Sequence, residues 1–379
     1  MLAPMRAERF PIGAAATIEA LAGDPHALLA RLREREPVSW LPAIGGWLVC
    51  RRDLALAAMR DAAAFTVQDP RFTTARVVGP SMLSLDGPEH DRHRAPFVEP
   101  LRLGEVRATL TGAVREEAAL LLDALEPAGA AELRRGFAGP LAAAVVTRSL
   151  GLSHADVEAV LGYYDAIVGA VSDLSAGRPA RPEAAAAVAS LGEALRLGAT
   201  GGLAEHEYVS NAAVMLFGGI ETTEGMIANA LVHLLSDAGE LARAREDPGR
   251  LAAVVEESLR LEPAAAAIDR YATEDAVLGG AEIVAGELVR ISITAANRDP
   301  ATFPDPHRFD PDRDNVRRHL AFAGGAHVCV GMHLARLEAH TALAMLLERL
   351  PRLRLDPARP PEIRGLVFRK PPELRAIWT

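Results

Sequence analysis

One cysteine near the C-terminal end of the sequence is the residue best placed to do chemistry. Cys329 lies in the stretch Phe-Ala-Gly-Gly-Ala-His-Val-Cys-Val-Gly at residues 322–331, and an amphipathic helix is predicted from Met332 to about Leu350. Glycines allow this loop conformations that other residues rarely adopt, and a following helix N-terminus favours a thiolate over a thiol. A single thiolate can ligate haem iron and promote O–O cleavage. The alternative is a buried structural cysteine in a tight loop.

A second polar group interrupts an apolar helix. The periodicity predicts one long helix from Tyr208 to about Leu235, which contains Gly-Gly-Ile-Glu-Thr-Thr at residues 218–223. Two glycines inside a helix cost on the order of 1 kcal/mol each relative to alanine. Some packing or functional need must offset this cost, and a close helix crossing is the simplest one.

Two charged pairs have helical spacing. His90 and Arg94 are four residues apart, so they share a helix face and could bind paired carboxylates. The alternative is a solvated charged face. Glu257 and Arg260 are three residues apart, and an exposed pair of this kind contributes little to stability.

The complete pattern Phe-x-x-Gly-x-His-x-Cys-x-Gly resembles the haem-binding loop of the bacterial cytochromes P450, which are haem-thiolate monooxygenases. Its fixed positions match at Phe322, Gly325, His327, Cys329 and Gly331. The other motifs follow in the family's order, so the resemblance covers the chain from about residue 40 to the end. It implies a mainly α fold with small β-sheets, in which haem b (iron protoporphyrin IX) lies between a long central helix and the cysteine-loop helix.

The resemblance also implies roles for individual residues. The thiolate of Cys329 would be the axial ligand of the iron. The haem propionates would be bound by His90, Arg94, Arg270 and His327. Glu221 and Thr222 would be the catalytic pair that relays protons, at a local opening of the long helix. Structural support of the haem loop would come from Glu257, Arg260, Arg308 and Phe322.

A substrate pocket is implied by the same resemblance. Residues 66–89 show little periodicity and match the family's variable loop over the haem. The pocket would be lined by Val77, Val78, Met82, Leu83, Phe217, Gly218, Ala265, Ala266, Val367 and Phe368. The apolar residues of the loop could equally anchor it to the core. One departure from the family is the short segment Gly198–Glu205, where relatives carry an additional helix.

Composition and sequence periodicity give the remaining expectations about class, domain organisation and secondary structure. The net charge of −9 argues against a nucleic-acid binder, and two cysteines exclude a disulfide framework. No signal peptide or transmembrane run is present, so we expect a soluble, cytoplasmic monomer with one domain, residues 1–379. The predicted strands are Val38–Leu41, Trp47–Arg51 with its core residue Cys50, Val289–Thr294 and Leu374–Trp378. The other predicted helices are Leu101–Leu125, Leu133–Leu150, Ala155 to about Leu174, and Glu183–Leu197, with a turn at Ser175–Pro182.

The electrons that a haem-thiolate monooxygenase consumes must come from other proteins, because this chain has no flavin, nicotinamide or iron–sulfur motif. We expect a ferredoxin and a ferredoxin reductase as electron donors. A basic patch for ferredoxin would be formed by Arg92, His93, Arg317, Arg318, His319 and Arg336. The alternative is scattered solubilising charge.

The expected reaction is hydroxylation or epoxidation of a hydrophobic small molecule by O2. Aromatic residues make up only 4% of the chain, and the predicted pocket segments are mostly small and aliphatic. These features favour a substrate of secondary metabolism, of polyketide or terpenoid type. Two other functions stay open, a peroxide-driven peroxygenase and a non-catalytic haem protein. Loss of coupled turnover in Thr222→Ala would favour the monooxygenase over the non-catalytic protein.

Overall fold

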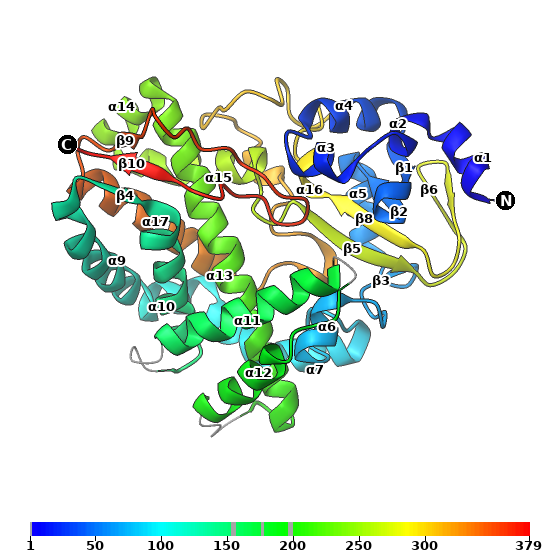
Figure 1. Cartoon of the computed structure of the whole chain (residues 1–379), viewed down its shortest axis with the longest axis horizontal. Coiled ribbons are helices and arrows are strands. Elements are labelled where there is room, and N and C mark those ends of the chain that lie inside the picture. The colour runs from blue at the N-terminus through cyan, green and yellow to red at the C-terminus, as the bar shows by residue number, and fades with distance from the viewer. Residues whose placement is uncertain (1, 153–156, 176–177, 196–199) are drawn as a thin grey trace. The chain divides into compact units, whose positions relative to one another are not determined.

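The computed structural model describes residues 2–152, 157–175, 178–195 and 200–379 (Figure 1). The chain divides into two compact units, each described here by itself. Unit 1 comprises Met1–Thr66, Ala228–Cys329 and Pro357–Leu374, and unit 2 comprises Val67–Ile227, Val330–Asp356 and Arg375–Thr379. The single domain expected for residues 1–379 stays a prediction.

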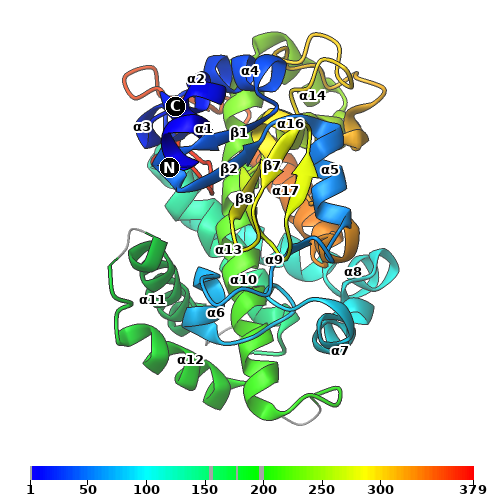
Figure 2. The ribbon, with the colours of Figure 1, turned by 90° about the vertical axis from the view of Figure 1, so that its right-hand side faces the viewer.

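Unit 1 is built on a five-stranded sheet (Figure 2). The strands follow the order β1 (Val38–Leu41), β2 (Gly46–Val49), β8 (Leu288–Ser292), β5 (Ala267–Ala272) and β3 (Phe65–Thr66). Strands β2 and β8 are parallel, with Trp47 opposite Val289, and the other pairs are antiparallel. The β-branched residues of these strands suit a sheet, and Val49, Val289 and Ile291 are fully buried in the core.

Unit 1 also contains several short helices. They are α1 (Leu2–Arg9), α2 (Pro11–Ala14), α3 (Ile18–Ala22), α4 (His26–Arg35), α5 (Arg52–Arg60), α14 (Ala238–Glu246), α15 (Leu251–Leu261) and α16 (Ile293–Ala296). A separate hairpin is formed by β6 (Ala276–Leu278) and β7 (Ala281–Ile283). Two short 3-10 turns, η7 (Val316–Arg318) and η8 (Gly325–His327), precede Cys329.

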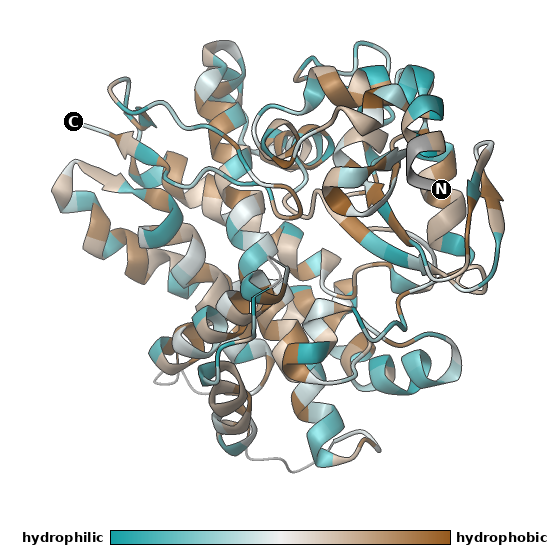
Figure 3. Cartoon of the chain, turned by 45° about the vertical axis from the view of Figure 1, so that its right-hand side comes forward, coloured by the Kyte–Doolittle hydropathy of each residue, from teal (hydrophilic) through white to brown (hydrophobic). Residues whose placement is uncertain are grey.

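Unit 2 is mainly helical. Its helices are α6 (Thr73–Val78), α7 (Gly87–Val98), α8 (Leu103–Thr109), α9 (Thr111–Leu125), α10 (Gly139–Ser149), α11 (Val157–Ser175), α12 (Glu183–Ala194), α17 (Met332–Arg349) and most of α13 (Glu205–Ser236). A small sheet has the strand order β4 (Ala130–Glu132), β10 (Arg375–Ile377) and β9 (Arg354–Leu355). The helices of both units contain hydrophobic as well as hydrophilic residues (Figure 3), as expected when one helix face is buried.

Most of the predicted elements are present, with several corrections. The long helix is confirmed as α13, and the cysteine-loop helix as α17. The strand predicted to reach Thr294 ends at Ser292, because the hydroxyl of Ser292 accepts the N–H of Ala295 and caps α16. The predicted helix Leu101–Leu125 is broken between α8 and α9, and Leu133–Leu150 begins as a π-helix at Arg134–Ala138.

One more correction concerns the long loop, and some predicted bounds fall on residues that are not described. Residues 66–89 contain the helix α6, which the sequence pattern did not predict. Two predicted helix bounds lie outside the described residues, namely the start of one helix at Ala155 and the end of another at Leu197. The same holds for parts of the predicted turn Ser175–Pro182 and of the short segment Gly198–Glu205. Among the described helices, none combines the length and the apolar character needed to cross a bilayer.

Candidate functional site

The cysteine loop is closed by its own backbone and lies close against helix α5. The N–H of Cys329 donates to the carbonyl of Phe322 at 2.9 Å. Gly325 has φ +72°, and a Cβ there would overlap the carbonyl oxygen of Met59. Both the conformation and the close approach therefore require glycine. The loop leaves Cys329 exposed, so the alternative of a buried structural cysteine is wrong.

The four residues predicted to bind the haem propionates are buried or half-buried. In unit 1, Arg270 on β5 is 4% exposed and donates to the carbonyl of Asp269 at 2.8 Å, and His327 in η8 is half-buried. In unit 2, His90 on α7 is 2% exposed, with Nδ1 3.2 Å from Oδ1 of Asp91. Arg94 lies one helical turn further along α7. Side chains of this type suit carboxylates such as haem propionates.

The Glu257–Arg260 pair is fully buried rather than exposed. Both side chains are 0% exposed, and Arg260 donates to both carboxylate oxygens at 2.8 and 2.7 Å. The guanidinium also donates to three backbone carbonyls, those of Asn297, Pro306 and Arg308. A buried ion pair is tolerated when its remaining donors are satisfied in this way.

The third member of this network differs from the expectation. The side chain that reaches Glu257 belongs to Arg313, whose Nε lies 3.4 Å from Oε1. Arg308 is exposed and contributes only its backbone carbonyl. The two arginines lie in an irregular segment without a helical or strand period, so spacing could not decide which one points inward. Phe322 is half-buried beside His319, with ring centroids 6.0 Å apart.

The acid–alcohol pair lies on α13. Glu221 is 7% exposed and accepts a hydrogen bond from the hydroxyl of Tyr164 on α11. The hydroxyl of Thr222 donates to the carbonyl of Gly218 at 2.6 Å, one turn earlier. This bond is the back-bonding pattern that bends helices. The expected local opening is not present as a break, because α13 is continuous from Glu205 to Ser236.

The two glycines of α13 have different explanations. A Cβ on Gly219 would lie 3.0 Å from Cγ2 of Val146, so the close crossing of α10 requires a small residue there. Around Gly218, a Cβ would meet none of the described atoms within 4 Å. A helix crossing therefore explains Gly219 but not Gly218.

Tyr164 was not among the predicted site residues. Burial raises the pKa of its phenol well above the ordinary value, and the charges of Glu221, Glu224 and Asp165 raise that pKa further. A signal was present in the sequence, because Tyr164 falls in the buried stripe of α11 with Val160 and Ile167. A buried tyrosine hydroxyl usually has a hydrogen-bond partner.

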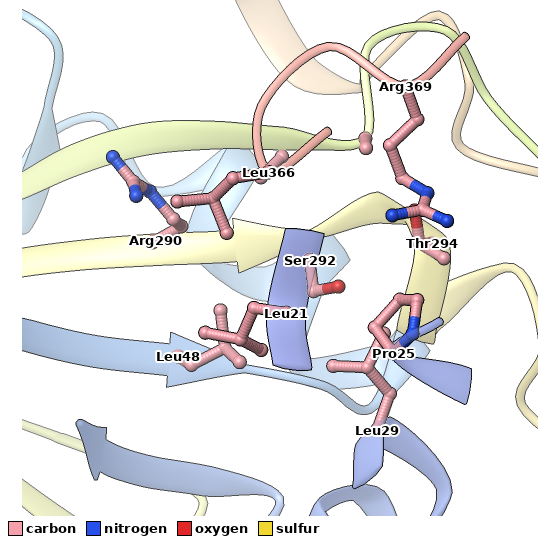
Figure 4. Close-up of a pocket in the computed structure, with 11 residues that line it drawn as sticks. Leu21, Pro25, Leu29, Leu48, Arg290, Ser292, Thr294, Leu366 and Arg369 are labelled. Atoms are coloured by element: carbon pink, nitrogen blue, oxygen red, sulfur yellow. The ribbon is translucent and has the colours of Figure 1, made fainter. Parts of the chain in front are cut away.

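The predicted pocket residues of unit 1 come together. The N–H of Ala266 donates to the carbonyl of Val367 at 2.8 Å, and Ala265 pairs with Phe368 in an antiparallel bridge. Next to them is a cavity of about 20 Å³, lined in part by Ala266, Thr294, Leu366 and Arg369 (Figure 4). A volume of this size holds one water molecule, so the cavity itself is no substrate pocket.

One buried carboxylate holds this C-terminal segment in place. Glu262 binds His26 at 2.5 Å, Arg298 at 2.9 Å and Arg369 at 3.1 Å. Burial raises the pKa of Glu262, but the interactions with His26, Arg298 and Arg369 outweigh this effect and lower the pKa to about 2. Arg369 also donates to the carbonyls of Ile363 and Gly365, so the turn that carries Val367 and Phe368 is bound to this cluster.

The predicted pocket residues of unit 2 divide into two groups. Val78, Met82 and Phe217 are buried, whereas Val77 and Leu83 are half-buried. The N–H of Met82 donates to Oδ1 of Asn211 on α13 at 2.8 Å. Met82 also belongs to a core cluster with Phe97 and Leu203. This packing favours the alternative that Met82 anchors the loop.

The predicted basic patch is smaller than expected. His93 and His319 are buried beside Glu207 and Glu256, and Arg92 is paired with Glu89 and Glu207. Arg317 and Arg318 are exposed on η7, and Arg52 of α5 donates to the carbonyl of Arg318. Burial lowers the pKa of Arg52, as do the charges of Arg318 and Arg60, against the opposing effect of Asp299. The cationic surface of unit 1 thus includes α5, which the sequence did not predict.

Comparisons with known proteins identify the family. Residues 249–375 match the family model Cytochrome P450. The chain is 35% identical to the cytochrome P450 monooxygenase PikC of Streptomyces venezuelae, over 88% of this chain and 86% of that protein. The chain belongs to the cytochrome P450 family. It is also 34% identical to the mycinamicin IV hydroxylase/epoxidase of Micromonospora griseorubida, over 92% of this chain and 94% of that enzyme.

Solved structures show the same fold. The crystal structure of P450BioI in complex with an acyl carrier protein ligated to hexadec-9Z-enoic acid has a TM-score of 0.83 and 28% identity, covering 94% of this chain and 99% of that one. The P450 fold is mainly helical with small sheets, as predicted. The chain is a bacterial P450 monooxygenase of the haem-thiolate type. Its exposed Cys329 and its buried Arg270 and His90 are donors of the kind that such a haem requires.

Proposed function

We propose that this P450 hydroxylates or epoxidises a hydrophobic small molecule of secondary metabolism, with Glu221 and Thr222 as the catalytic pair. The observation that carries the proposal is this pair on α13, a buried acid with a hydroxyl donor followed by an alcohol bonded one turn back. Such a pair moves protons from solvent to a reaction centre. A peroxygenase or a non-catalytic haem protein has no need of it.

The remaining roles are proposed from the motifs that this chain shares with the family. Cys329 would hold the iron, while the propionates would be bound by His90, Arg94, Arg270 and His327. Bound haem supplies the redox chemistry that activates dioxygen. Glu257, Arg260 and Arg313 would keep the segment before the cysteine loop rigid, because their shared network contacts residues 297–310 through backbone atoms.

The substrate class is supported by the small aliphatic residues Ala265, Ala266 and Val367, and by the relative whose name describes a hydroxylase and epoxidase. We expect an optical titration of the ferric protein to give the largest low- to high-spin Soret shifts with aliphatic or polycyclic metabolites. Planar aromatic and highly charged compounds are the control panel. A response confined to that control panel would contradict the proposed substrate class.

The proposed electron donor is a reduced ferredoxin, which would use the cationic surface of Arg52, Arg60, Arg317 and Arg318. Arg317→Glu with Arg318→Glu should slow reduction by ferredoxin about tenfold or more at low salt, because charge steering raises association rates by such factors. Stopped-flow reduction measures this effect, which should shrink at high salt.

The control makes the same charge change elsewhere in unit 1. Arg31→Glu with Arg35→Glu alters two arginines of α4, both on the protein surface. Reduction of this control should stay close to that of the parent. Equal slowing of both double variants would show a general charge effect and would remove Arg317 and Arg318 from the docking surface.

A further inference from the structure

The turn at residues 81–84, in the loop before α7, is joined to α13 by one hydrogen bond. Within the turn, the N–H of Ser81 donates to the hydroxyl of Ser84 at 3.1 Å, and the N–H of Ser84 donates to the carbonyl of Ser81 at 2.9 Å. Among the described residues, the bond from the N–H of Met82 to Oδ1 of Asn211, at 2.8 Å, is the one hydrogen bond that leaves the turn. The placement of the turn therefore depends on the carboxamide of Asn211 and on the packing of Met82.

Backbone groups fix the orientation of this carboxamide. Asn211 is fully buried, and the oxygen and nitrogen of its amide are told apart by their partners. The N–H of Met82 can only donate, so the atom that it reaches is Oδ1. The carbonyl of Glu207 can only accept, and it lies 2.8 Å from Nδ2. The second N–H of Nδ2 is then left for Nδ1 of His93, at 2.9 Å, so Nδ1 must be an acceptor.

His93 can accept this hydrogen bond in only one form of its ring. Nδ1 carries no proton, so the ring proton lies on Nε2, which is 3.5 Å from Oε1 of Glu207. Burial is the main cause that lowers the pKa of His93 from its ordinary value of 6.5. The carboxylates of Glu207 and Glu89 oppose this shift, and the charge of Arg92 adds to it. The ring is therefore neutral at neutral pH, which is the form that the carboxamide of Asn211 needs.

The outer end of this network is fixed as well. Glu207 accepts from Arg92 at 2.6 and 2.8 Å, and from the N–H of Ala204 at 2.9 Å. An ion pair at the protein surface contributes little stability of its own, but this one holds the carboxylate that faces His93. The contacts thus run from the surface of α7 and α13 to the N–H of Met82 in the interior.

We propose that Asn211 and His93 are positioning residues for substrate, which together form a latch that holds the turn at residues 81–84 against α13. The inference rests on the proposed hydrophobic substrate and on the predicted place of Met82 and Leu83 beside it. Only the latched turn covers the substrate. The apparent affinity for a molecule that needs this cover therefore scales with the latched fraction of the protein.

The test compares Asn211→Leu with Ser210→Ala in the ferric holoenzyme. Asn211→Leu keeps a similar side-chain volume and removes the acceptor of Met82. Hydrogen exchange of the Met82 amide, measured by mass spectrometry with fragmentation, should become about fivefold faster or more, as expected for the loss of one hydrogen bond. Ser210 is the matched control, because it is also buried on α13 and its hydroxyl donates to the carbonyl of His206 in the same helix. Equal acceleration in Ser210→Ala would show a general loosening of α13 and would refute the latch.

Azole binding measures whether the latch acts on the pocket. Imidazole and 4-phenylimidazole both bind ferric haem iron through a ring nitrogen, and only 4-phenylimidazole adds an apolar group that needs cover. Asn211→Leu should weaken the binding of 4-phenylimidazole about fivefold and that of imidazole by less than about twofold. An equal loss for both azoles, or no loss despite faster exchange of the Met82 amide, would overturn the positioning role.

Two variants of His93 cover the case in which Asn211→Leu fails to fold. His93→Phe removes the acceptor that orients Asn211, so exchange of the Met82 amide should again become faster. His93→Asn keeps an acceptor near the position of Nδ1 and should restore the exchange rate of the parent. Equal exchange in these two variants would refute the latch. A failure of the proposed function would appear separately, as Soret shifts confined to planar aromatic and charged compounds, and the exchange rates would still decide the latch.

Discussion

Cys329→Ser should reduce turnover to the level of haem in buffer and remove the thiolate-type spectrum of the reduced carbon monoxide complex. The expected loss follows from the proposed role of Cys329, because serine oxygen cannot replace the electron donation of a thiolate. The loop itself should stay folded, since its fixing contacts are made by the backbone of Gly325 and of Cys329. Absorption spectra and product formation measure the two effects.

The second cysteine provides the control. Cys50 is fully buried, and burial raises the pKa of its thiol to about 12, so it stays protonated at ordinary pH. Cys50→Ala should keep the thiolate spectrum and lose only about 1 kcal/mol of stability. A normal spectrum in Cys329→Ser, or its loss in Cys50→Ala, would contradict the assignment of Cys329 as the ligand.

Arg260→Met should lower the free energy of unfolding by about 3–5 kcal/mol, as expected when one partner of a buried ion pair is removed. The carboxylate of Glu257, which is 0% exposed, would lose the bidentate guanidinium. Three backbone carbonyls would lose a donor at the same time. Urea unfolding monitored by circular dichroism gives the change.

Two further variants test whether the loss of stability comes from the buried ion pair. Arg308→Met removes an exposed guanidinium and keeps the carbonyl that Arg260 uses, so its effect should be within about 0.5 kcal/mol. Glu257→Gln combined with Arg260→Met should recover part of the loss, because the buried carboxylate that loses its bidentate guanidinium is then replaced by a neutral amide. A cost for Arg308→Met as large as that for Arg260→Met would refute the assignment of Arg313 as the third member of the network.

The features that the sequence predicts well depend on local periods. The long helix α13, the cysteine-loop helix α17 and the strand pair β1–β2 follow directly from apolar spacing. The pairing of Glu257 with Arg260 is also local, since three residues separate them on α15. In each of these cases the neighbours along the chain are also the neighbours in space.

The features that it missed depend on contacts between distant segments. Tyr164 and Glu221 are 57 residues apart, and no local pattern indicates that α11 and α13 bring them together. Arg313 replaces Arg308 because of the path of an irregular segment. Likewise, the different roles of Gly218 and Gly219 depend on which side of α13 faces α10. The spacing of residues within one helix or strand contains no information about which distant segment that helix or strand contacts.

The cluster around Glu262 has a thermodynamic consequence for acid tolerance. Its folded-state pKa of about 2 lies below the ordinary value of 4.5, so folding releases a proton when the pH lies between these values. The stabilisation is therefore fully present above pH 4.5 and disappears as the pH falls toward 2. Glu262 consequently keeps its contacts with His26, Arg298 and Arg369 in mild acid, and Arg369 keeps the turn at Val367 and Phe368 bound to it. Acid inactivation near pH 5 is therefore not expected to begin at this cluster.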